Sequence, residues 1–516
     1  MTLKEKIGQK ISIGIAGTSM NDHFKKMVKE YKAGNVILFR HSLIDAKHAK
    51  QFCKEIREFV FGETGHYPFI SVDQEGGTVV RLPQDMINIP GAMALAASGS
   101  TENITLSARI TAAELRRVGI NMNLSPCLDI NCNRDNPVIG NRSYAVDTEN
   151  VSLYSSALIK AYEEEGLMSC GKHFPGHGDT NVDSHLDLPL IDRNMEEMME
   201  RELIPFKLAI EAGIPAIMTA HILFPKIEQE KIPATMSRKI LQGILREKLG
   251  FKGMILSDCM MMNAIKDFYG VAKGCVQAVS AGVDLLFICH ESPFMEESFI
   301  AINKAYEEGL FDANEFEQSI ERIINFKKKY VNFGKDSDVE SLEELDKRKK
   351  QNDDLTRSSL ALLRPGEKLP PLGGKPLFIG SVAYRSSGAA GKPEVTSFAR
   401  RLAEKLSGNF IESPVNPTPE EIKDILSKLP EVSSIILGTA NGHINRGQID
   451  LGIELLKGAD ARKIPFICLA LRNPWDLYLI PEGSYGMAVW EYTEKAFDAA
   501  AAVLRGEFTP QGRLPC

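Results

Sequence analysis

The chain has 516 residues, of which 43% are hydrophobic and 25% are charged, and its formal net charge at pH 7 is −7. This length predicts two or more domains, and the composition is typical of globular proteins with large apolar cores. The acidic balance argues against a nucleic-acid-binding surface, and no apolar run approaches the ~20 residues of a membrane-spanning helix. We therefore expect neither nucleic acid nor a membrane as a partner.

The beginning of the chain and the cysteines predict a cytoplasmic location. Charged residues at Lys4–Lys6 and Lys10 interrupt the first apolar stretch, which does not have the pattern of a secretory signal. The chain has nine cysteines, an odd number, and several stand in apolar runs, so reduced, buried thiols fit better than a disulfide framework. Cys127 and Cys132 are too far apart for a CxxC zinc pair.

Eight short apolar runs, separated by longer amphipathic segments, occupy residues 1–335. They are Ile11–Ala16, Asn35–Phe39, Pro68–Asp73, Asn121–Ser125, Met168–Lys172, Ala216–Ala220, Met254–Ser257 and Val283–Ile288. Their Ile, Val, Leu and Met content with little alternation is typical of strands buried on both faces. Helices are expected between them, among others at Thr101–Val118, Met195–Ala212 and Arg238–Leu249. Eight such units predict an α/β fold, a (β/α)₈ barrel of the TIM type, with an irregular doubly wound sheet as the alternative.

The pattern changes near residue 335, which predicts a second domain. Helix Phe316–Tyr330 has one apolar face and would close a barrel domain of residues 1–335. Residues 336–369 include a strongly charged stretch, and we expect a connecting helix or linker there. A smaller α/β sandwich domain is expected over residues 370–516. Its strands are predicted at Pro376–Val382, Ser433–Gly438, Pro465–Leu471 and Gly486–Trp490, and its helices include Pro419–Leu429 and Thr493–Leu504.

Polar residues follow several predicted barrel strands at the point where each strand ends. They are Asp73, Lys172, His173, His221 and Asp258, with Arg142 in the loop after the fourth strand. The carboxyl ends of parallel barrel strands meet at one rim, where active sites lie. The sequence therefore predicts a polar ligand site at this rim.

Each of these residues also has a purely structural interpretation. A lone aspartate after a strand, such as Asp258, is most often a helix N-cap. Here the carboxylate stands between the apolar runs Met254–Ser257 and Cys259–Met262, which would desolvate it and leave it available for chemistry. Arg142 has an alternative as a structural ion-pair partner, and His221 as a hydrogen-bonded core histidine.

The segment Gly171–His185 combines glycines and a proline with polar side chains that bind ligands, move protons or hold metals. One interpretation is a metal site, for which the possible ligands are His173, His177, Asp179, Asp183 and His185. Their spacings match none of the familiar metal motifs. The other interpretation is proton transfer, in which Asp183 would orient His185 while Asp258 acts as the nucleophile of a two-step displacement.

At these residues the chain resembles glycoside hydrolase family 3, and more narrowly its bacterial β-N-acetylglucosaminidase branch. The motifs that carry the resemblance are Asp73-Gln74-Glu75-Gly76-Gly77, Pro137-Val138-Ile139-Gly140-Asn141-Arg142-Ser143, Lys172-His173-Phe174-Pro175-Gly176-His177-Gly178, Asp183-Ser184-His185 and Leu256-Ser257-Asp258. In the second domain they are Leu471-Arg472-Asn473-Pro474-Trp475-Asp476 and Gly512-Arg513-Leu514-Pro515. Together, in this order, these motifs are highly specific.

The resemblance implies a barrel followed by an α/β sandwich domain and a retaining hydrolase that works through a covalent glycosyl-enzyme. It implies that Asp258 is the nucleophile and that His185, oriented by Asp183, is the acid and then the base. The positions expected to hold the sugar hydroxyls are Asp73, Arg81, Arg142, Lys172 and His173. The expected substrate is a carbohydrate with a terminal N-acetyl-β-D-glucosaminyl residue, such as a muropeptide in cell-wall recycling. No metal and no organic cofactor is expected.

Two departures and several alternatives accompany this prediction. Thr78 stands where the family usually has an arginine, and Cys259–Met262 replaces a more polar run. The alternatives within enzymes are a glycoside phosphorylase and a family 3 β-glucosidase or xylosidase. A non-catalytic sugar-binding protein is the alternative from another class, although it would have no need of the catalytic trio. The loop Gly442–Gly447 has two interpretations, a loop that covers the site and a plain surface turn. The sequence does not predict the oligomeric state.

Overall fold

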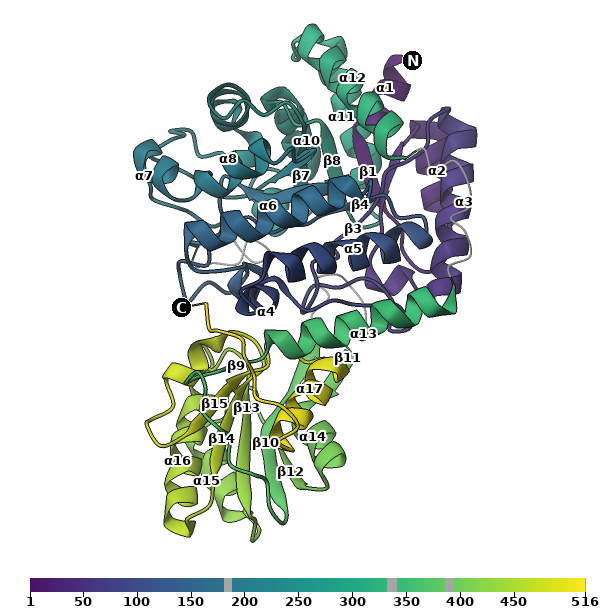
Figure 1. The fold of residues 1–516 in the computed structure, drawn as a ribbon. Helices are drawn as coiled ribbons and strands as arrows, with labels where there is room; N and C mark the ends of the chain where they lie inside the picture. Colours follow the sequence, from purple (N-terminus) through teal and green to yellow (C-terminus); the bar gives the residue numbers. More distant parts are fainter. Residues whose placement is uncertain (181–187, 332–340, 386–393, 516) are drawn as a thin grey trace.

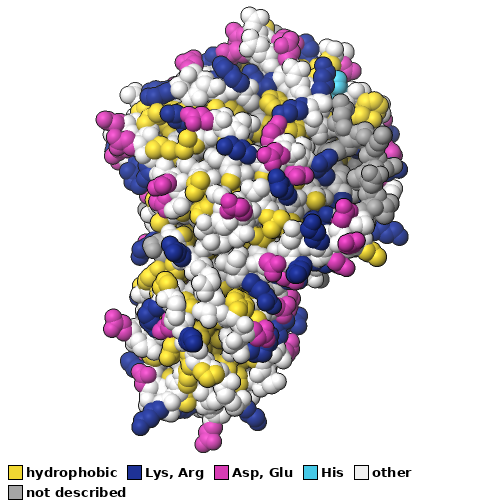
Figure 2. Space-filling view, viewed as in Figure 1, with side chains coloured by type: hydrophobic (Ala, Val, Ile, Leu, Met, Phe, Trp, Pro, Cys, Tyr) yellow, Lys and Arg dark blue, Asp and Glu magenta, His cyan; other side chains and the backbone are white. Residues whose placement is uncertain are grey.

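The computed structural model describes residues 1–180, 188–331, 341–385 and 394–515. Two units are visible in Figure 1, a barrel surrounded by helices and a smaller domain built on a second sheet, with α13 (Leu342–Ser359) lying between them. On the face seen in Figure 2, positive and negative side chains are interspersed over both units.

The barrel is a closed ring of eight parallel strands in chain order, which confirms the predicted (β/α)₈ architecture. The strands are β1 (Ile11–Gly14), β2 (Asn35–Ile37), β3 (Ile70–Val72), β4 (Met122–Asn123), β5 (Met168–Phe174), β6 (Ala216–Thr219), β7 (Met254–Cys259) and β8 (Leu285–Ile288). The ring closes where Ile11 of β1 lies beside Leu286 of β8. Nearly all strand residues are buried, as expected for a sheet covered on both faces.

Helices surround the ring, and the longer ones have an apolar face that is buried. They are α1 (Leu3–Gln9), α2 (Asp22–Tyr31), α3 (Ala46–Thr64), α4 (Ala92–Ala97), α5 (Thr101–Arg117), α6 (Thr148–Glu164), α7 (Met195–Glu200), α8 (Leu203–Glu211), α9 (Asn263–Lys266), α10 (Val271–Ala281), α11 (Phe294–Glu307) and α12 (Ala313–Tyr330). Short 3₁₀ turns are η1 (Arg40–Ser42), η2 (Gly140–Arg142) and η3 (Ala234–Met236), and η4 (Lys239–Lys248) is wound as a π-helix. Asn21, Asp45, Ser100 and Asp147 cap four of the helices by accepting a backbone N–H.

One predicted helix, Met195–Ala212, is divided into α7 and α8. The break falls at Arg201, whose backbone leaves the helical region, and the Arg201 side chain pairs with that of Glu202. Arg201 also binds the Asp179 carboxylate at 2.9 Å. The division therefore turns two charged side chains toward the segment that follows β5.

The second domain is a mixed sheet with helices on both faces, as predicted. Its strand order is β11-β10-β13-β14-β15-β9, with β12 also paired to β10. The strands are β9 (Ala361–Leu362), β10 (Pro376–Arg385), β11 (Glu394–Ser397), β12 (Asn409–Ser413), β13 (Ser434–Thr439), β14 (Phe466–Ala470) and β15 (Tyr485–Ala488). The remaining elements are α14 (Phe398–Leu406), α15 (Pro419–Ser427), α16 (Gly447–Arg462), η5 (Pro474–Tyr478) and α17 (Glu494–Leu504).

Two separate apolar cores, one on each face, hold this sheet. One core contains Ile425 of α15 and Leu455 of α16, and the other contains Leu402 of α14 and Phe497 of α17. Figure 1 shows α15 and α16 on one side of the sheet and α14 and α17 on the other. The domain is therefore a three-layer sandwich in which the central strands β10, β13, β14 and β15 have an apolar layer on each side.

The expected linker, residues 336–369, contains regular structure in its described part. The helix α13 contacts α4 and α5 of the barrel as well as α17 of the second domain. It leads directly into β9, which pairs antiparallel with β15. The division of the chain at residues 335 and 369 stays a prediction, with the addition that β9 belongs to the second sheet.

The two domains are joined by specific polar contacts around Trp490. The Trp490 indole, which is 1% exposed, donates to the Ser359 carbonyl oxygen at 2.7 Å. The Asn141 amide on the barrel rim donates to the Trp490 carbonyl oxygen at 2.8 Å. Gly140 has a φ of 47°, and a Cβ there would lie 2.7 Å from Oδ1 of Asn473, so this contact requires glycine. The second domain is therefore fitted closely onto the barrel rim.

Within the described residues, none of the helices combines the length and apolar character needed to cross a bilayer.

We expect Trp490→Phe to destabilise the second domain by about 1–2 kcal/mol, because the Ser359 carbonyl would lose its buried donor. Denaturant unfolding followed by far-UV circular dichroism measures this loss. Trp475→Phe is the matched control, because Trp475 is 2% exposed and its indole N–H has no partner within the described residues. Equal destabilisation by the two substitutions would contradict the role given to the Trp490 hydrogen bond.

Candidate active site

A cavity of about 510 Å³ opens at the carboxyl ends of the barrel strands, and both domains contribute to its wall. All six described residues that the sequence assigned to the site line it: Asp73, Arg81, Arg142, Lys172, His173 and Asp258. Asp183 and His185 lie outside the described residues. Of the strand-end side chains expected at this rim, His221 is the described one that does not line the cavity.

The floor of the cavity is organised by Lys172, which is 2% exposed. Its ammonium nitrogen lies 2.8 Å from a carboxylate oxygen of Asp73 and 2.7 Å from one of Glu75. Arg81 adds a second, longer contact to Asp73 at 3.4 Å. Although burial alone raises the pKa of Asp73, the neighbouring positive charge of Lys172 keeps that pKa below its usual value. Asp73 is therefore ionised in the neutral pH range.

Glu75 is a residue of this network that the sequence did not single out, although it belongs to the motif beginning at Asp73. Arg142 binds both of its carboxylate oxygens, through Nη2 at 2.8 Å and through Nε at 2.9 Å. Burial raises the pKa of Glu75, but Arg142 and Lys172 together hold it well below the usual range. The arginine is thus both an ion-pair partner, as its structural interpretation proposed, and part of the cavity wall.

Asp129 orients His173, near the end of β5, and His177, just after that strand. Its carboxylate lies 2.7 Å from Nδ1 of His173 and accepts the backbone N–H of His177 at 2.7 Å. His177 in turn places Nδ1 2.9 Å from the Thr180 hydroxyl. Burial raises the pKa of Asp129, yet the neighbouring His173 ring lowers it to about 2. The close packing of this segment also requires Gly178, where a Cβ would lie 1.7 Å from the Ile130 carbonyl oxygen.

These contacts bear on the metal interpretation of the same segment. Asp179 binds Arg193 and Arg201 at 2.8 and 2.9 Å, away from the two histidines. In the described part of the chain, the groups with metal-ligand spacing are Cys127–Asp129–His173 and Cys132–Asp179–Glu202, so the histidines and Asp179 do not share one group. Asp129 already accepts several N–H groups, which favours an orienting role for its carboxylate.

Asp258 ends β7, lines the cavity, and is half-buried. One of its carboxylate oxygens accepts the backbone N–H of Cys259 at 2.7 Å. The N-cap interpretation is wrong, because the next helix, α9, begins after Met262. His221 lies behind this strand end, with Nε2 3.0 Å from the Cys259 carbonyl oxygen and Nδ1 2.8 Å from the Thr235 hydroxyl. It fits its core-histidine interpretation and helps to hold the end of β7 in place.

The second domain contributes Asn441, Arg472 and Asn473 to the cavity wall, which the sequence did not predict. Arg472 and Asn473 belong to a motif that carried the resemblance, but nothing in the motif assigns them a place. Burial lowers the pKa of Arg472. The adjoining loop Gly442–Gly447 is tied down, because the buried Asp476 carboxylate accepts the backbone N–H groups of Gly442 and His443.

A family model described as the glycosyl hydrolase family 3 N terminal domain matches residues 2–326. The chain belongs to glycosyl hydrolase family 3. This match covers the whole barrel and confirms the resemblance noted in the sequence.

Named relatives and solved structures agree with this family. The chain is 33% identical over 286 residues to "Beta-hexosaminidase A" of Pseudoalteromonas piscicida, an alignment that covers 52% of this chain and only 48% of that protein. It is 31% identical over 293 residues to "Beta-hexosaminidase" of Thiobacillus denitrificans, covering 56% of this chain and 80% of the relative. A family 3 β-N-acetylglucosaminidase structure from Paenibacillus sp. str. FPU-7 superimposes with a TM-score of 0.91 and 34% identity, covering 100% of this chain and 98% of that one.

We expect the stability of the barrel to fall as the pH falls from about 6.5 to 4, in part because of His177. Burial lowers the pKa of this histidine from 6.5 to about 4, so in that window the unfolded chain binds a proton that the folded chain does not. The loss from this one group is about 3 kcal/mol. The measurement is chemical unfolding at a series of pH values for wild type and His177→Asn.

The variant should show a flatter pH dependence than wild type over this window. His48→Asn, the same substitution at a half-buried histidine of α3, is the matched control. A His177→Asn curve parallel to that of wild type would show that this ring is not held in its neutral form.

Proposed function

We propose that this chain is an exo-acting, retaining β-N-acetylglucosaminidase that hydrolyses terminal N-acetyl-β-D-glucosaminyl residues through a covalent glycosyl-enzyme. The observation that carries the proposal is that Asp258 faces the same cavity as the linked charged groups Asp73, Glu75, Arg142 and Lys172. The names of the relatives and the agreement with the Paenibacillus structure over the full chain support it.

In the proposed reaction, charged groups on the cavity floor bind the hydroxyls of one sugar ring. Asp73, Lys172 and Arg142 suit this role, because they offer fixed acceptors and donors whose orientation is set before the sugar arrives. Arg81 and His173 are proposed to complete this set. The ring is thereby held with its anomeric carbon above the carboxylate that is to attack it.

Asp258 is proposed to attack the anomeric carbon, which forms the glycosyl–enzyme ester and breaks the bond to the leaving oxygen. His185, oriented by Asp183, gives a proton to that oxygen, then takes one from a water molecule that releases the sugar. A histidine fits this role because both of its protonation states are accessible near neutral pH. The reaction requires neither a metal nor an organic cofactor.

We also propose an anionic muropeptide as the natural substrate and a cytoplasmic location. Arg472 brings a positive charge from the second domain to the cavity wall, which would favour an anionic aglycone. The eight described cysteines are unpaired thiols, mostly buried, as is usual in a reducing compartment.

Asp258→Asn should lower the rate of release of nitrophenol from a nitrophenyl N-acetyl-β-D-glucosaminide by about 10³-fold or more, because it removes the attacking carboxylate. A slow fluorinated analogue should add the mass of one sugar to the wild-type peptide that contains residue 258.

Asp267→Asn is the matched control. Asp267 is an exposed aspartate directly after α9, and this variant should keep wild-type turnover. Near wild-type turnover by Asp258→Asn, or a trapped sugar on another residue, would overturn the nucleophile assignment. A sugar 1-phosphate formed in phosphate buffer would indicate phosphorolysis instead of hydrolysis.

His185→Ala should slow substrates with poor leaving groups by about 10²- to 10⁴-fold while slowing activated aryl glycosides much less, because only poor leaving groups need the proton. Rates for a series of aryl N-acetylglucosaminides with different leaving-group pKa values give this comparison. Equal slowing across the series would count against an acid role for His185.

A further inference from the structure

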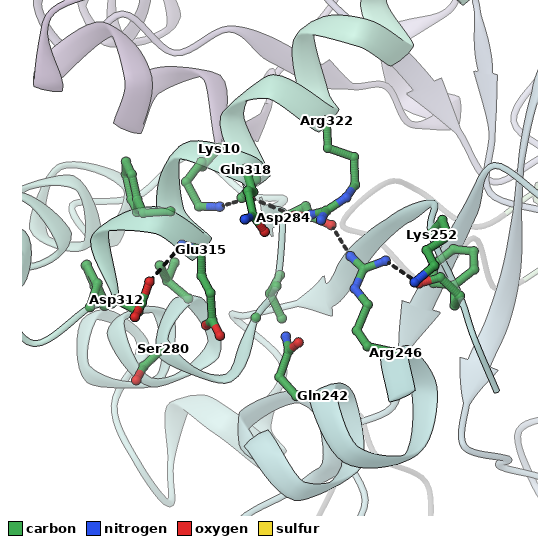
Figure 3. Close-up of a pocket in the computed structure, with 17 residues that line it drawn as sticks. Lys10, Gln242, Arg246, Lys252, Ser280, Asp284, Asp312, Glu315, Gln318 and Arg322 are labelled. Carbon is green, nitrogen blue, oxygen red and sulfur yellow. Dashed lines mark hydrogen bonds and ion pairs between the residues drawn. The ribbon is translucent and has the colours of Figure 1, made fainter. Parts of the chain in front are cut away.

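A second cavity, of about 330 Å³, lies at the opposite end of the barrel from Asp258. Its wall includes Lys10, which directly precedes β1, and Asp284, which directly precedes β8. Arg246 of η4 and Arg322 of α12 reach into the same space from two helices, and Figure 3 shows both guanidinium groups turned toward Asp284. Since all the strands run parallel, this is the rim formed by their amino ends.

The Asp284 carboxylate, which is fully buried, is saturated with hydrogen-bond donors. One oxygen accepts from the Ser319 hydroxyl and from Nη1 of Arg322, each at 2.6 Å. The other accepts from Nη2 of Arg246 and from the backbone N–H of Ile255, each at 2.8 Å. A carboxylate offers about four acceptor positions, so Asp284 has none left for another donor.

The cations around Asp284 outnumber it. Lys10, Arg246 and Arg322 surround this single carboxylate, which leaves an excess of two positive charges. Of the other charged residues in the wall, Glu315 is paired with Arg238 outside the cavity at 2.6 Å. Lys252 and Asp312, which also line the cavity, carry opposite charges and leave this sum unchanged.

The donors that remain need an acceptor. Lys10 is 1% exposed, and its ammonium group has three N–H donors, one of which is used by the Ser319 hydroxyl. The bond from Arg322 to Asp284 uses only Nη1 of its guanidinium. Arg246, in contrast, already donates to the Phe251 and Gly253 carbonyl oxygens as well as to Asp284. Burial lowers the pKa of Lys10 to about 8, as expected for a positive charge that lacks enough partners. An anion in the cavity would supply those partners.

We infer that this cavity is a binding site for a phosphate group, either free or carried by a small phosphorylated sugar, distinct from the site that contains Asp258. The charge of phosphate near neutral pH, between about −1 and −2, offsets most of the excess around Asp284, and its oxygens fit arginine and lysine donors. The group would lie against Arg322 and Lys10, with Lys252 at the mouth of the cavity.

Occupation of this site should stabilise the barrel without altering the chemical step at the other rim. Asp284 and Lys10 both hold strand ends together, because Asp284 accepts from Ile255 of β7 and the Lys10 carbonyl accepts from Leu286 of β8 at 2.8 Å. A bound anion that neutralises the cations around them favours the folded state, since the unfolded chain has no such cluster.

The test is a titration of the full-length protein with inorganic phosphate at constant ionic strength, followed by calorimetry and by thermal unfolding. We expect saturable binding and a rise in Tm with phosphate over matched chloride. Arg322→Gln should weaken phosphate binding by about 10-fold or more, the effect of losing one charged bond of about 1.4 kcal/mol. Lys252→Gln should weaken it by a smaller factor. A parallel titration with glucose 6-phosphate distinguishes free phosphate from a phosphorylated sugar as the ligand. If glucose 6-phosphate binds more tightly than inorganic phosphate, the ligand is a sugar phosphate.

Lys248→Gln is the matched control, since Lys248 is an exposed lysine of η4 outside the cavity and its loss removes the same charge. It should bind phosphate as wild type does. Lys252 is exposed, so Lys252→Gln reports on the cavity even if Arg322→Gln does not fold. No saturable binding by wild type, or equal affinities in Lys252→Gln and Lys248→Gln, would overturn the inference. Because the readouts are affinity and Tm, they do not depend on the proposed glycosidase activity.

Discussion

The buried ammonium group of Lys172 is the contact on which the geometry of the candidate active site depends. It links Asp73, which follows β3, with Glu75 in the loop beyond it, and Lys172 itself stands on β5. Two carboxylates this close in a poorly hydrated site would repel each other without a cation between them. Arg142 extends the same network to the loop after β4 by binding Glu75. Three neighbouring strand ends are thereby held in one arrangement by charge.

This network consists of the protein's own side chains, and this affects what the cavity can do. Side chains fixed by ion pairs present donors and acceptors to a sugar at defined positions, so little reorganisation accompanies binding. Asp129 does the same for His173 and His177 on the adjoining segment. Asp258 differs from these acids in its place, because it stands near the end of β7 and is half-buried in the cavity wall.

The barrel and most of the placed site residues could be predicted from the sequence for two simple reasons. Each barrel strand is a short apolar run, and the chain of a parallel barrel brings every residue that follows a strand to the same rim. Glu75 and Asp129 were missed because their roles are set by partners 67 and 44 residues away, which no local pattern reveals. The strand β9 was missed because its two residues closely follow the charged helix α13, and only the pairing with β15 makes them a strand. Asn441, Arg472 and Asn473 reach the cavity only through the docking of one domain on the other.

That docking has a thermodynamic consequence. The cavity wall combines Asp258 of the barrel with Arg472 of the second domain, while Trp490 and Asn141 hold the two domains together. A ligand that contacts both walls is bound more tightly by the assembled pair than by either domain alone. By reciprocity, the same ligand must strengthen the attachment of the domains by an equal amount of free energy. Substrate affinity and domain association in this chain are thus two measures of one coupled equilibrium.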